Sequence, residues 1–331
     1  MDQLERLPQD TRIRILASSK PGHVVPCIGL ARQLGIEPDL CPVRPRCLFA
    51  ALAPWGPADP LDSAATSPPW PDIAIASARE TVPALRKLKR KSGGRIFTVF
   101  LGDPRTNRSV FDLIWAPQHD NLSGPNIVST LTAPHPHGDL ANGIETLEEA
   151  GEALDSRLPL LPQPRVTCLI GGPNSRFAFG PEDIARTWQA LEQLLAQGAS
   201  LMVSPSRRTP QIVVEKLLLL AQTSPHRMFV WDGYGQNPYR QMLALADGFL
   251  VTSDSVNMIG EALAVGKPVH ILKLTGDPGK FAQLYEGLRL GELAREWNGA
   301  LETWQTKPYD STPVIAAELL QRYAAFRRTL K

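Results

Sequence analysis

The chain has 331 residues, which exceeds what one compact core usually holds and predicts two domains of about 150 residues each. Charged residues make up 21% and hydrophobic residues 43% of the sequence, a balance that argues against extensive disorder. The formal net charge is only +2, so the composition does not support a nucleic-acid-binding domain, which usually carries a marked basic excess.

The cysteines and the N-terminus bear on the cellular compartment. The four cysteines contain no CxxC pair, which disfavours a zinc or dithiol redox site and favours reduced thiols in a cytosolic protein. The polar start, MDQLERLPQDTR, lacks the apolar core of a secretory signal, and no segment reaches the ~18 apolar residues of a membrane span. We expect a cytoplasmic protein, with peripheral attachment to the inner face of a membrane left open.

Short apolar runs alternate with helical patterns in the first half of the chain. Several of the runs are continuous and β-branched, as strands buried on both faces of a parallel sheet are. A helix pattern closed by Gly35 lies between the first two runs. A proline-rich insertion at 53–72 lacks periodicity and predicts a loop that is either functional or disordered. The predicted strands are 13–18, 39–43, 72–77, 95–101, 111–116 and 126–131.

The second half shows the same alternation more regularly. A helical pattern at 143–158 leads into LPLLPQPR, a proline-studded connection of the type that joins domains. Five predicted strands then alternate with four predicted helices, which favours a doubly wound parallel sheet. We therefore expect an α/β fold of two Rossmann-like domains, at 1–143 and 163–311, with a linker at 144–162. No GxGxxG fingerprint is present, which weakens a dinucleotide-binding role.

Three strand ends of the second domain carry polar residues. Ligands of open parallel sheets bind beyond the carboxyl ends of strands, where helix N-termini present unpaired N–H groups. Glycines there allow close approach of a ligand, and arginines can pair with phosphate in a bidentate way, so these loops predict an anion site. The alternative is that glycine and serine serve only the turns. The residues are Gly171, Gly172, Asn174, Ser206, Arg207, Arg208, Thr252, Ser253, Asp254 and Ser255.

The helix expected after the third of these loops carries a lone carboxylate. If this helix begins near Ser255, then Asp254, Asn257 and Glu261 form one polar stripe along it. Glu261 would then face the loops, where its two oxygens suit the vicinal hydroxyl groups of a sugar. The alternative is a solvated or capping glutamate.

The motifs in this order resemble the bacterial branch of the mitochondrial fission ELM1 family. The resemblance rests on the GG and SRRTP loops, on DGYGQNPYRQMLALAD and VTSDSVNMIGEALAVGKPVHI, and on FDLIWAPQHDNLSGPNIVSTL in the first half. The second domain is also similar, more loosely, to the donor half of GT-B glycosyltransferases. That similarity implies two domains facing a cleft, with a C-terminal helix at 312–331 that returns to the first domain. It also implies a ribose contact for Glu261 and diphosphate binding by the strand-end loops, with no metal or cofactor besides the nucleotide-sugar donor.

The first domain supplies candidates for a catalytic base. The loop SSKPGHVVP matches, through Lys20, Gly22 and His23, the glycine-rich loop and histidine that many GT-B transferases carry at this position. His23 is the main candidate, because a histidine that titrates near neutrality can take a proton from an acceptor hydroxyl. Its alternative is a structural histidine. Asp103 and Asp120, the latter beside His119, compete for the role or could orient His23.

Three functions remain open. The first is a metal-independent, inverting transfer of a sugar from a nucleotide-activated donor to an unknown acceptor, and the second is a non-catalytic scaffold. The third is a sugar-nucleotide epimerase, which needs several carboxylates around the sugar, for which Asp103, Asp254, Glu261 and Asp277 are the candidates. The basic run at 86–95 suits a lipid-linked or envelope acceptor at an anionic membrane surface, or is simply a solvated helix face.

Overall fold

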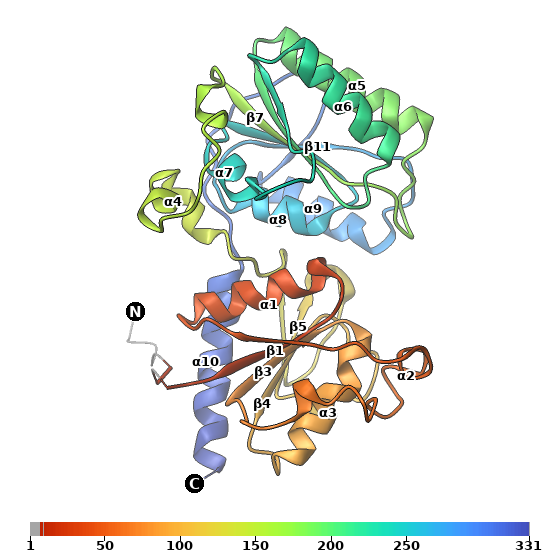
Figure 1. The fold of residues 1–331 in the computed structure, drawn as a ribbon, viewed down its shortest axis with the longest axis vertical. Helices are drawn as coiled ribbons and strands as arrows, with labels where there is room; N and C mark the ends of the chain where they lie inside the picture. Colours follow the sequence, from red (N-terminus) through yellow and green to blue (C-terminus); the bar gives the residue numbers. More distant parts are fainter. Residues whose placement is uncertain (1–6, 9, 331) are drawn as a thin grey trace. The chain divides into compact units, whose positions relative to one another are not determined.

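The computed structural model describes residues 7–8 and 10–330, and the chain divides into two compact units. Unit 1 comprises residues 1–136 and 311–331, and unit 2 comprises residues 137–310. Each unit contains a six-stranded parallel sheet with helices packed on it (Figure 1). The prediction of an α/β fold with two Rossmann-like domains is confirmed. Within the described residues, no helix is long and apolar enough to cross a membrane.

The sheet of unit 1 has the strand order β2-β1-β3-β4-β5-β6. One face is covered by α1 (Pro21–Gln33) and the other by α3 (Val82–Lys91), and a short α2 (Cys47–Leu52) follows β2. The insertion at 53–72 lies against this sheet, where the buried Arg14 donates to the carbonyls of Ser67 at 2.8 Å and Pro69 at 2.9 Å. The strands are β1 (Ile13–Ala17), β2 (Asp39–Pro42), β3 (Ile73–Ser77), β4 (Phe97–Leu101), β5 (Leu113–Pro117) and β6 (Ile127–Thr130).

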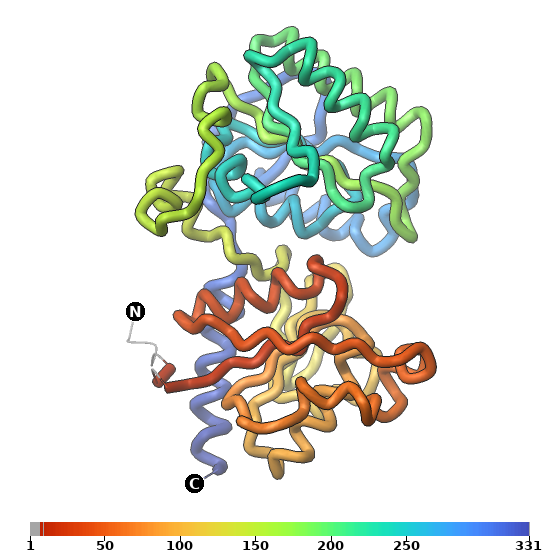
Figure 2. Tube along the Cα trace, viewed as in Figure 1, coloured from red at the N-terminus to blue at the C-terminus, as the bar shows by residue number. Residues whose placement is uncertain are grey.

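The last helix of the chain, α10 (Thr312–Thr329), completes unit 1 after the chain has formed unit 2. Its buried face presents Ile315 and Leu319 to the same core as α1. Its Tyr323 ring meets the ring of Phe97 on β4 edge to face, with 5.6 Å between ring centroids. Figure 2 shows the α10 segment running beside the N-terminal segment that holds α1.

The sheet of unit 2 has the strand order β12-β11-β10-β7-β8-β9. Helices α5 (Pro181–Ala196) and α6 (Gln211–Thr223) lie on one face, and α8 (Val256–Leu263) and α9 (Ala282–Leu290) lie on the other (Figure 1). The short α7 (Tyr239–Ala244) connects β9 to β10. The strands are β7 (Arg165–Ile170), β8 (Ser200–Pro205), β9 (Met228–Val230), β10 (Gly248–Thr252), β11 (Val269–Leu272) and β12 (Arg295–Glu296).

The segment at 143–158 differs from the expected long helix and linker. Its helix α4 spans only Glu145–Glu149, because the chain turns at Gly151, whose φ of 66° lies in the left-handed region. The rest of the segment is tied to α7, where Asp155 N–H donates to Gln241 at 2.7 Å and Arg240 pairs with Glu152 at 3.0 Å. The expected linker at 144–162 therefore belongs to unit 2, and the chain enters that unit at residue 137 rather than 163.

Both sheets contain a point where the strand order reverses. In unit 1 the chain places β2 on one side of β1 and β3 on the other, and in unit 2 it places β8 and β10 on opposite sides of β7. At such a point the two following connections diverge to opposite faces and open a crevice beyond the carboxyl ends of the strands. The loops after β7 and β10, and those after β1 and β3, are therefore the places to look for a site.

We predict that Leu319→Ala destabilises unit 1 alone, by roughly 2–5 kcal/mol, because the fully buried side chain would leave a cavity between α10 and the sheet. Hydrogen exchange read separately in β3 and β7 is the suitable measurement, since a chain of two units need not unfold in one transition. The matched control is Val314→Ala on the same helix, whose side chain is 59% exposed. An equal loss of protection in β7 would contradict the assignment of α10 to unit 1.

Candidate functional site

Three strand-end loops of unit 2 meet where the strand order reverses. The N–H of Gly171, after β7, donates to the hydroxyl of Thr252 on β10 at 2.7 Å. The N–H of Gly172 donates to the Asp254 carboxylate at 3.0 Å. The guanidinium of Arg208, after β8, donates to the carbonyl of Gly172 at 3.0 Å. The sequence prediction that these loops come together at one edge of the sheet agrees with this geometry.

The Asp254 carboxylate is the centre of this arrangement. Its side chain has no exposed surface, and it forms a 2.7 Å ion pair with Arg208, whose side chain is 40% exposed. Asp254 also accepts a hydrogen bond from the Thr252 hydroxyl at 2.7 Å. A Cβ atom on Gly171 would lie 2.1 Å from the Asp254 Oδ1 atom, so glycine is required at 171 by Asp254 itself.

Most of the other predicted phosphate-binding residues also have partners inside the protein. The side chain of Asn174 donates to the carbonyl of Asp254 at 3.2 Å, and the Ser206 hydroxyl accepts from Arg208 N–H at 3.2 Å. The Ser253 hydroxyl accepts from Leu274 N–H at 3.0 Å. The carbonyl of Ser253 accepts from the Tyr285 hydroxyl. These residues hold the loops together, and their contact with a phosphate stays a prediction.

The part of the predicted anion site that remains open is the start of α8. This helix begins at Val256, and its N-cap residue Ser255 makes no side-chain capping bond. Ser255 and Asn257 are half-buried, and Arg207 on the neighbouring loop is exposed. The first amide groups of a helix lack intrahelical acceptors and favour an anion. Contact of a phosphate with Arg207, Ser255 and the first turn of α8 therefore stays a prediction.

Glu261 lies farther along α8 and is only 8% exposed, which excludes a solvated or capping glutamate. Its Oε2 atom accepts a 2.5 Å hydrogen bond from the hydroxyl of Tyr239, the first residue of α7. Burial raises the pKa of Glu261 above the ordinary value, and the hydrogen bond from Tyr239 lowers it in part. Burial and then the Glu261 charge raise the pKa of Tyr239 well above its usual value, so this phenol is a donor.

Two features of this site were not found from the sequence. The Tyr239 contact spans 22 residues, and the only signal for it was the aromatic-rich stretch around GYGQNPY. A fourth loop, after β11, joins the same edge through Asp183, a buried residue in the first turn of α5. Asp183 accepts from Thr275 N–H at 2.7 Å and from the Thr275 hydroxyl at 2.9 Å. Asp183, which also accepts from Gly180 N–H at the start of α5, thus fixes the loop after β11.

His23 lies at the corresponding edge of unit 1, in the first turn of α1. Its Nδ1 atom is 3.3 Å from the hydroxyl of Ser77, the last residue of β3, so the pair spans the point where the strand order of unit 1 reverses. Burial lowers the pKa of His23, while Glu80 raises it and Lys20 lowers it by smaller amounts. The imidazole is therefore neutral at neutral pH.

The remaining candidates of unit 1 lie along the same sheet edge. Lys20 and Gly22 are exposed at the start of α1. Asp103 follows β4 and accepts from Arg105 N–H at 3.0 Å. Asp120 follows β5, with the buried His119 ring 3.8 Å away. The structure brings these residues to one edge, and their catalytic roles stay predictions.

The basic run at 86–95 is partly used within unit 1. Arg86 donates to the carbonyl of Gly56 at 2.7 Å, and Lys89 pairs with Asp112 at 2.8 Å, with both side chains of that pair largely buried. Only part of the run is therefore available to an acceptor or a membrane. Across residues 7–8 and 10–330, no group of three or more His, Cys, Asp or Glu side chains has an arrangement suited to a metal ion.

Solved structures of similar fold cover nearly the whole chain. The UDP-GlcNAc 2-epimerase of Methanocaldococcus jannaschii matches with a TM-score of 0.51 and 11% identity, over 96% of this chain and 100% of that chain. Its complex with UDP-GlcNAc and UDP matches with a TM-score of 0.50 and 13% identity, over the same shares. MurG of Acinetobacter baumannii gives 0.46 and 13%, over 96% and 94%. Identities this low show the fold alone, which the chain shares with the two epimerase structures.

Sequence relatives place the chain more narrowly. The mitochondrial fission protein ELM1 of Arabidopsis thaliana is 29% identical over 276 residues, covering 77% of this chain, which spans only 64% of that protein. The uncharacterized protein RP120 of Rickettsia prowazekii (strain Madrid E) is 29% identical over 285 residues, covering 74% of this chain and 78% of that protein. The family model for mitochondrial fission ELM1 matches residues 21–323. The chain therefore belongs to the mitochondrial fission ELM1 family.

Proposed function

We propose that unit 2 binds a nucleotide-activated sugar beyond the carboxyl ends of β7 and β10, and that the protein transfers the sugar to an acceptor hydroxyl without a metal. The observation that carries the proposal is Glu261, a buried carboxylate on the helix that begins at the point where the strand order reverses. A buried carboxylate is costly unless hydrogen bonds compensate it, so its retention at this place favours a ligand that donates hydrogen bonds.

The geometry of α8 suits the two halves of a nucleoside diphosphate. Tyr239 contacts Oε2 of Glu261, whereas Oε1 receives no hydrogen bond from the described part of the chain. This leaves Oε1, together with the second lone pair of Oε2, for the vicinal hydroxyls of a ribose. The first turn of α8 precedes Glu261 by five residues, or roughly 8 Å along the helix axis. A diphosphate at that turn would meet the positive end of the helix and Arg207.

His23 has the protonation state that a base requires. The Ser77 hydroxyl donates its single proton to the carbonyl of Leu101 at 2.8 Å, so its contact with His23 Nδ1 requires a proton on Nδ1. The Nε2 atom of the neutral ring then carries the lone pair.

In the proposed reaction His23 Nε2 takes the acceptor hydroxyl proton, and the acceptor oxygen bonds to the anomeric carbon. The bond from that carbon to the phosphate oxygen breaks with its electrons leaving on the diphosphate, which inverts the carbon.

An epimerase is the second candidate, favoured by the UDP-GlcNAc 2-epimerases among the similar folds. Proton abstraction from a sugar requires free carboxylates near it. Asp254 is fully buried and paired with Arg208, and Asp277 accepts from Gly279 N–H at 2.8 Å. Of the carboxylates that the sequence suggested, Asp254 is thus unavailable to a sugar, whereas Asp277 keeps one oxygen without this bond. Epimer formation from a UDP-sugar incubated without an acceptor would favour this function over transfer.

A non-catalytic scaffold is the third candidate, because the Arabidopsis relative is named for mitochondrial fission. A fold can persist after its chemistry is lost. This candidate requires no nucleotide affinity, so the binding experiment below separates it from the two enzymes. The acceptor of the proposed transfer, whether lipid-linked, part of the cell envelope or of another kind, is left open.

We predict that Glu261→Gln weakens binding of a nucleotide-activated sugar by at least about tenfold, because the neutral amide accepts hydroxyl hydrogen bonds less strongly than a carboxylate does. Isothermal titration with UDP-, GDP-, ADP- and CMP-activated sugars measures the affinity. Glu149→Gln is the matched control, since Glu149 is an exposed glutamate of the same unit. Absence of binding of every one of these donors to the wild-type protein would overturn the proposal.

The affinity should also depend on pH through Glu261. Ribose hydroxyls donate to the charged carboxylate, so we expect affinity to fall as the pH is lowered through the raised pKa, at a pH above the ordinary 4.5 of a glutamate. The folding stability of the ligand-free protein has the opposite pH dependence. Because the pKa of Glu261 is raised in the folded state, the protein loses stability as the pH rises from the unfolded-state pKa of this carboxyl through its folded-state pKa. Titrations from about pH 4.5 to pH 8 test the first expectation. An affinity with the same pH dependence in Glu261→Gln would contradict it.

We predict that His23→Gln lowers sugar transfer, or the slower transfer to water, by about 10²–10⁴-fold and leaves the donor affinity of unit 2 unchanged. Release of free nucleoside diphosphate measures the reaction, and titration measures the affinity. His226→Gln, which changes an exposed histidine, is the control. Unchanged turnover in His23→Gln, with a loss in Asp103→Asn or Asp120→Asn, would move the base to that aspartate.

A further inference from the structure

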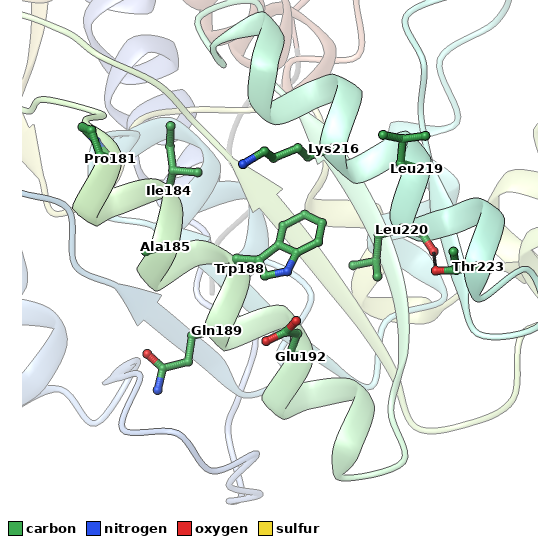
Figure 3. Close-up of a pocket in the computed structure, with 10 residues that line it drawn as sticks. All are labelled: Pro181, Ile184, Ala185, Trp188, Gln189, Glu192, Lys216, Leu219, Leu220 and Thr223. Atoms are coloured by element: carbon green, nitrogen blue, oxygen red, sulfur yellow. Dashed lines mark hydrogen bonds between the residues drawn. The ribbon is translucent and has the colours of Figure 1, made fainter.

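An apolar groove runs between α5 and α6 on the outer face of unit 2. Its cavity has a volume of about 780 Å³. Figure 3 shows Trp188 of α5 lying between the two helices at the middle of this groove. The groove is lined by Pro181, Ile184, Ala185, Trp188, Gln189, Glu192, Lys216, Leu219, Leu220 and Thr223.

Helix α6 contains more apolar residues than it buries. Its sequence QIVVEKLLLLAQT contains four consecutive leucines, yet only Val213 and Leu217 are fully buried. Leu219 is 60% exposed and Ile212 is 51% exposed. Leu218 and Leu220 pack partly against the core of unit 2, whereas Ile212 and Leu219, seven residues apart on one face of the helix, do not. A soluble helix normally turns such residues toward a core, and exposed apolar residues on one face favour an interaction site. The α5–α6 face is thus a surface that another macromolecule should cover.

The charges of the groove are arranged in a self-complementary way. Lys216 lies on the α6 wall level with Ile184, and Glu192 lies on the α5 wall beyond Trp188 (Figure 3). One cation and one carboxylate therefore flank Trp188 on opposite walls and toward opposite ends of an otherwise apolar groove. A rotation of 180° about an axis through the groove at Trp188 exchanges these two ends.

We propose that a second copy of this chain covers the groove, with the two-fold axis passing near Trp188. A two-fold interface uses the same patch on both copies, so each charge must meet its opposite after the rotation. Lys216 would then face Glu192 of the partner subunit, and the reciprocal pair would form at the other end. Leu219 and Leu220 of the α6 wall would also pack against the partner, burying apolar surface that α6 now exposes.

Sedimentation velocity of the full chain over a concentration series tests the proposal. The expected species has twice the 36.3 kDa mass of the chain. Lys216→Glu alone, or Glu192→Lys alone, would set like charges against each other and raise the dimer dissociation constant by at least about tenfold. The double variant Lys216→Glu with Glu192→Lys would restore the wild-type constant, since the pairs re-form with their signs exchanged.

A second variant separates the surface from general effects of charge. Leu219→Glu should give a monomer, because it places a carboxylate on the apolar α6 wall that the partner would cover. Leu290→Glu changes a leucine of α9 that is 68% exposed and should leave the dimer intact. A wild-type chain that stays monomeric at all concentrations overturns the proposal. So does a dimer that Leu219→Glu and both single charge reversals leave unchanged.

Discussion

The buried carboxylate of Asp254 is the contact on which the geometry of unit 2 depends. A charge without exposed surface requires nearby donors, and here they are Arg208, the hydroxyl of Thr252 and the amide of Gly172. These donors come from the ends of three different strands, so one side chain fixes the separation of β7, β8 and β10 at their carboxyl edge. Leaving a buried amide without an acceptor costs about 1–3 kcal/mol, which disfavours any looser packing of these loops. The glycine at 171 follows from the same contact, since any side chain there would overlap the carboxylate.

The position of Glu261 follows from Asp254 in turn. Helix α8 starts two residues after Asp254, so the loop that the aspartate fixes also sets where the helix begins and which face it turns to α7. Tyr239 then meets Glu261, and the next residue, Arg240, pairs with Asp139 at 2.6 Å and with Glu152 at 3.0 Å. The segment expected to be a linker is thereby part of the support of the candidate site. A carboxylate that is buried and hydrogen-bonded to a residue supported in this way has little freedom to turn toward water, which is the preorganisation that a ribose contact needs.

The sequence predicted the two sheets well because their strands are short, continuous and β-branched, so the signal lies within each strand. It predicted the grouping of the loops for a similar reason, because parallel strands bring their carboxyl ends to one edge whatever residues they carry. It failed where the signal is a contact between distant residues. The glycines of the GG loop suggested room for a ligand, but the atoms beside Gly171 belong to Asp254, 83 positions away in the chain. The helical pattern at 143–158 was overstated because Gly151 ends the helix by its conformation rather than by its hydrophobicity. The Tyr239 contact has no local signature.

The two units carry different kinds of group at equivalent points of their sheets, charged groups in unit 2 and uncharged groups in unit 1. In unit 2 the strand-order reversal between β7 and β10 carries charges, namely the ion pair of Asp254 with Arg208 and, two residues after Asp254, the positive end of α8. In unit 1 the reversal between β1 and β3 carries His23 and Ser77, whose hydrogen-bond chain to the carbonyl of Leu101 is uncharged. Burial keeps the imidazole neutral, whereas the anion-binding end of a helix works by its partial charge. The proposed transfer would need both kinds of group, a fixed positive potential for the departing diphosphate and an uncharged base for the incoming hydroxyl. One α/β scaffold used twice can supply them, because the strand-order reversal fixes a position in space and leaves the chemistry of its loops free to differ.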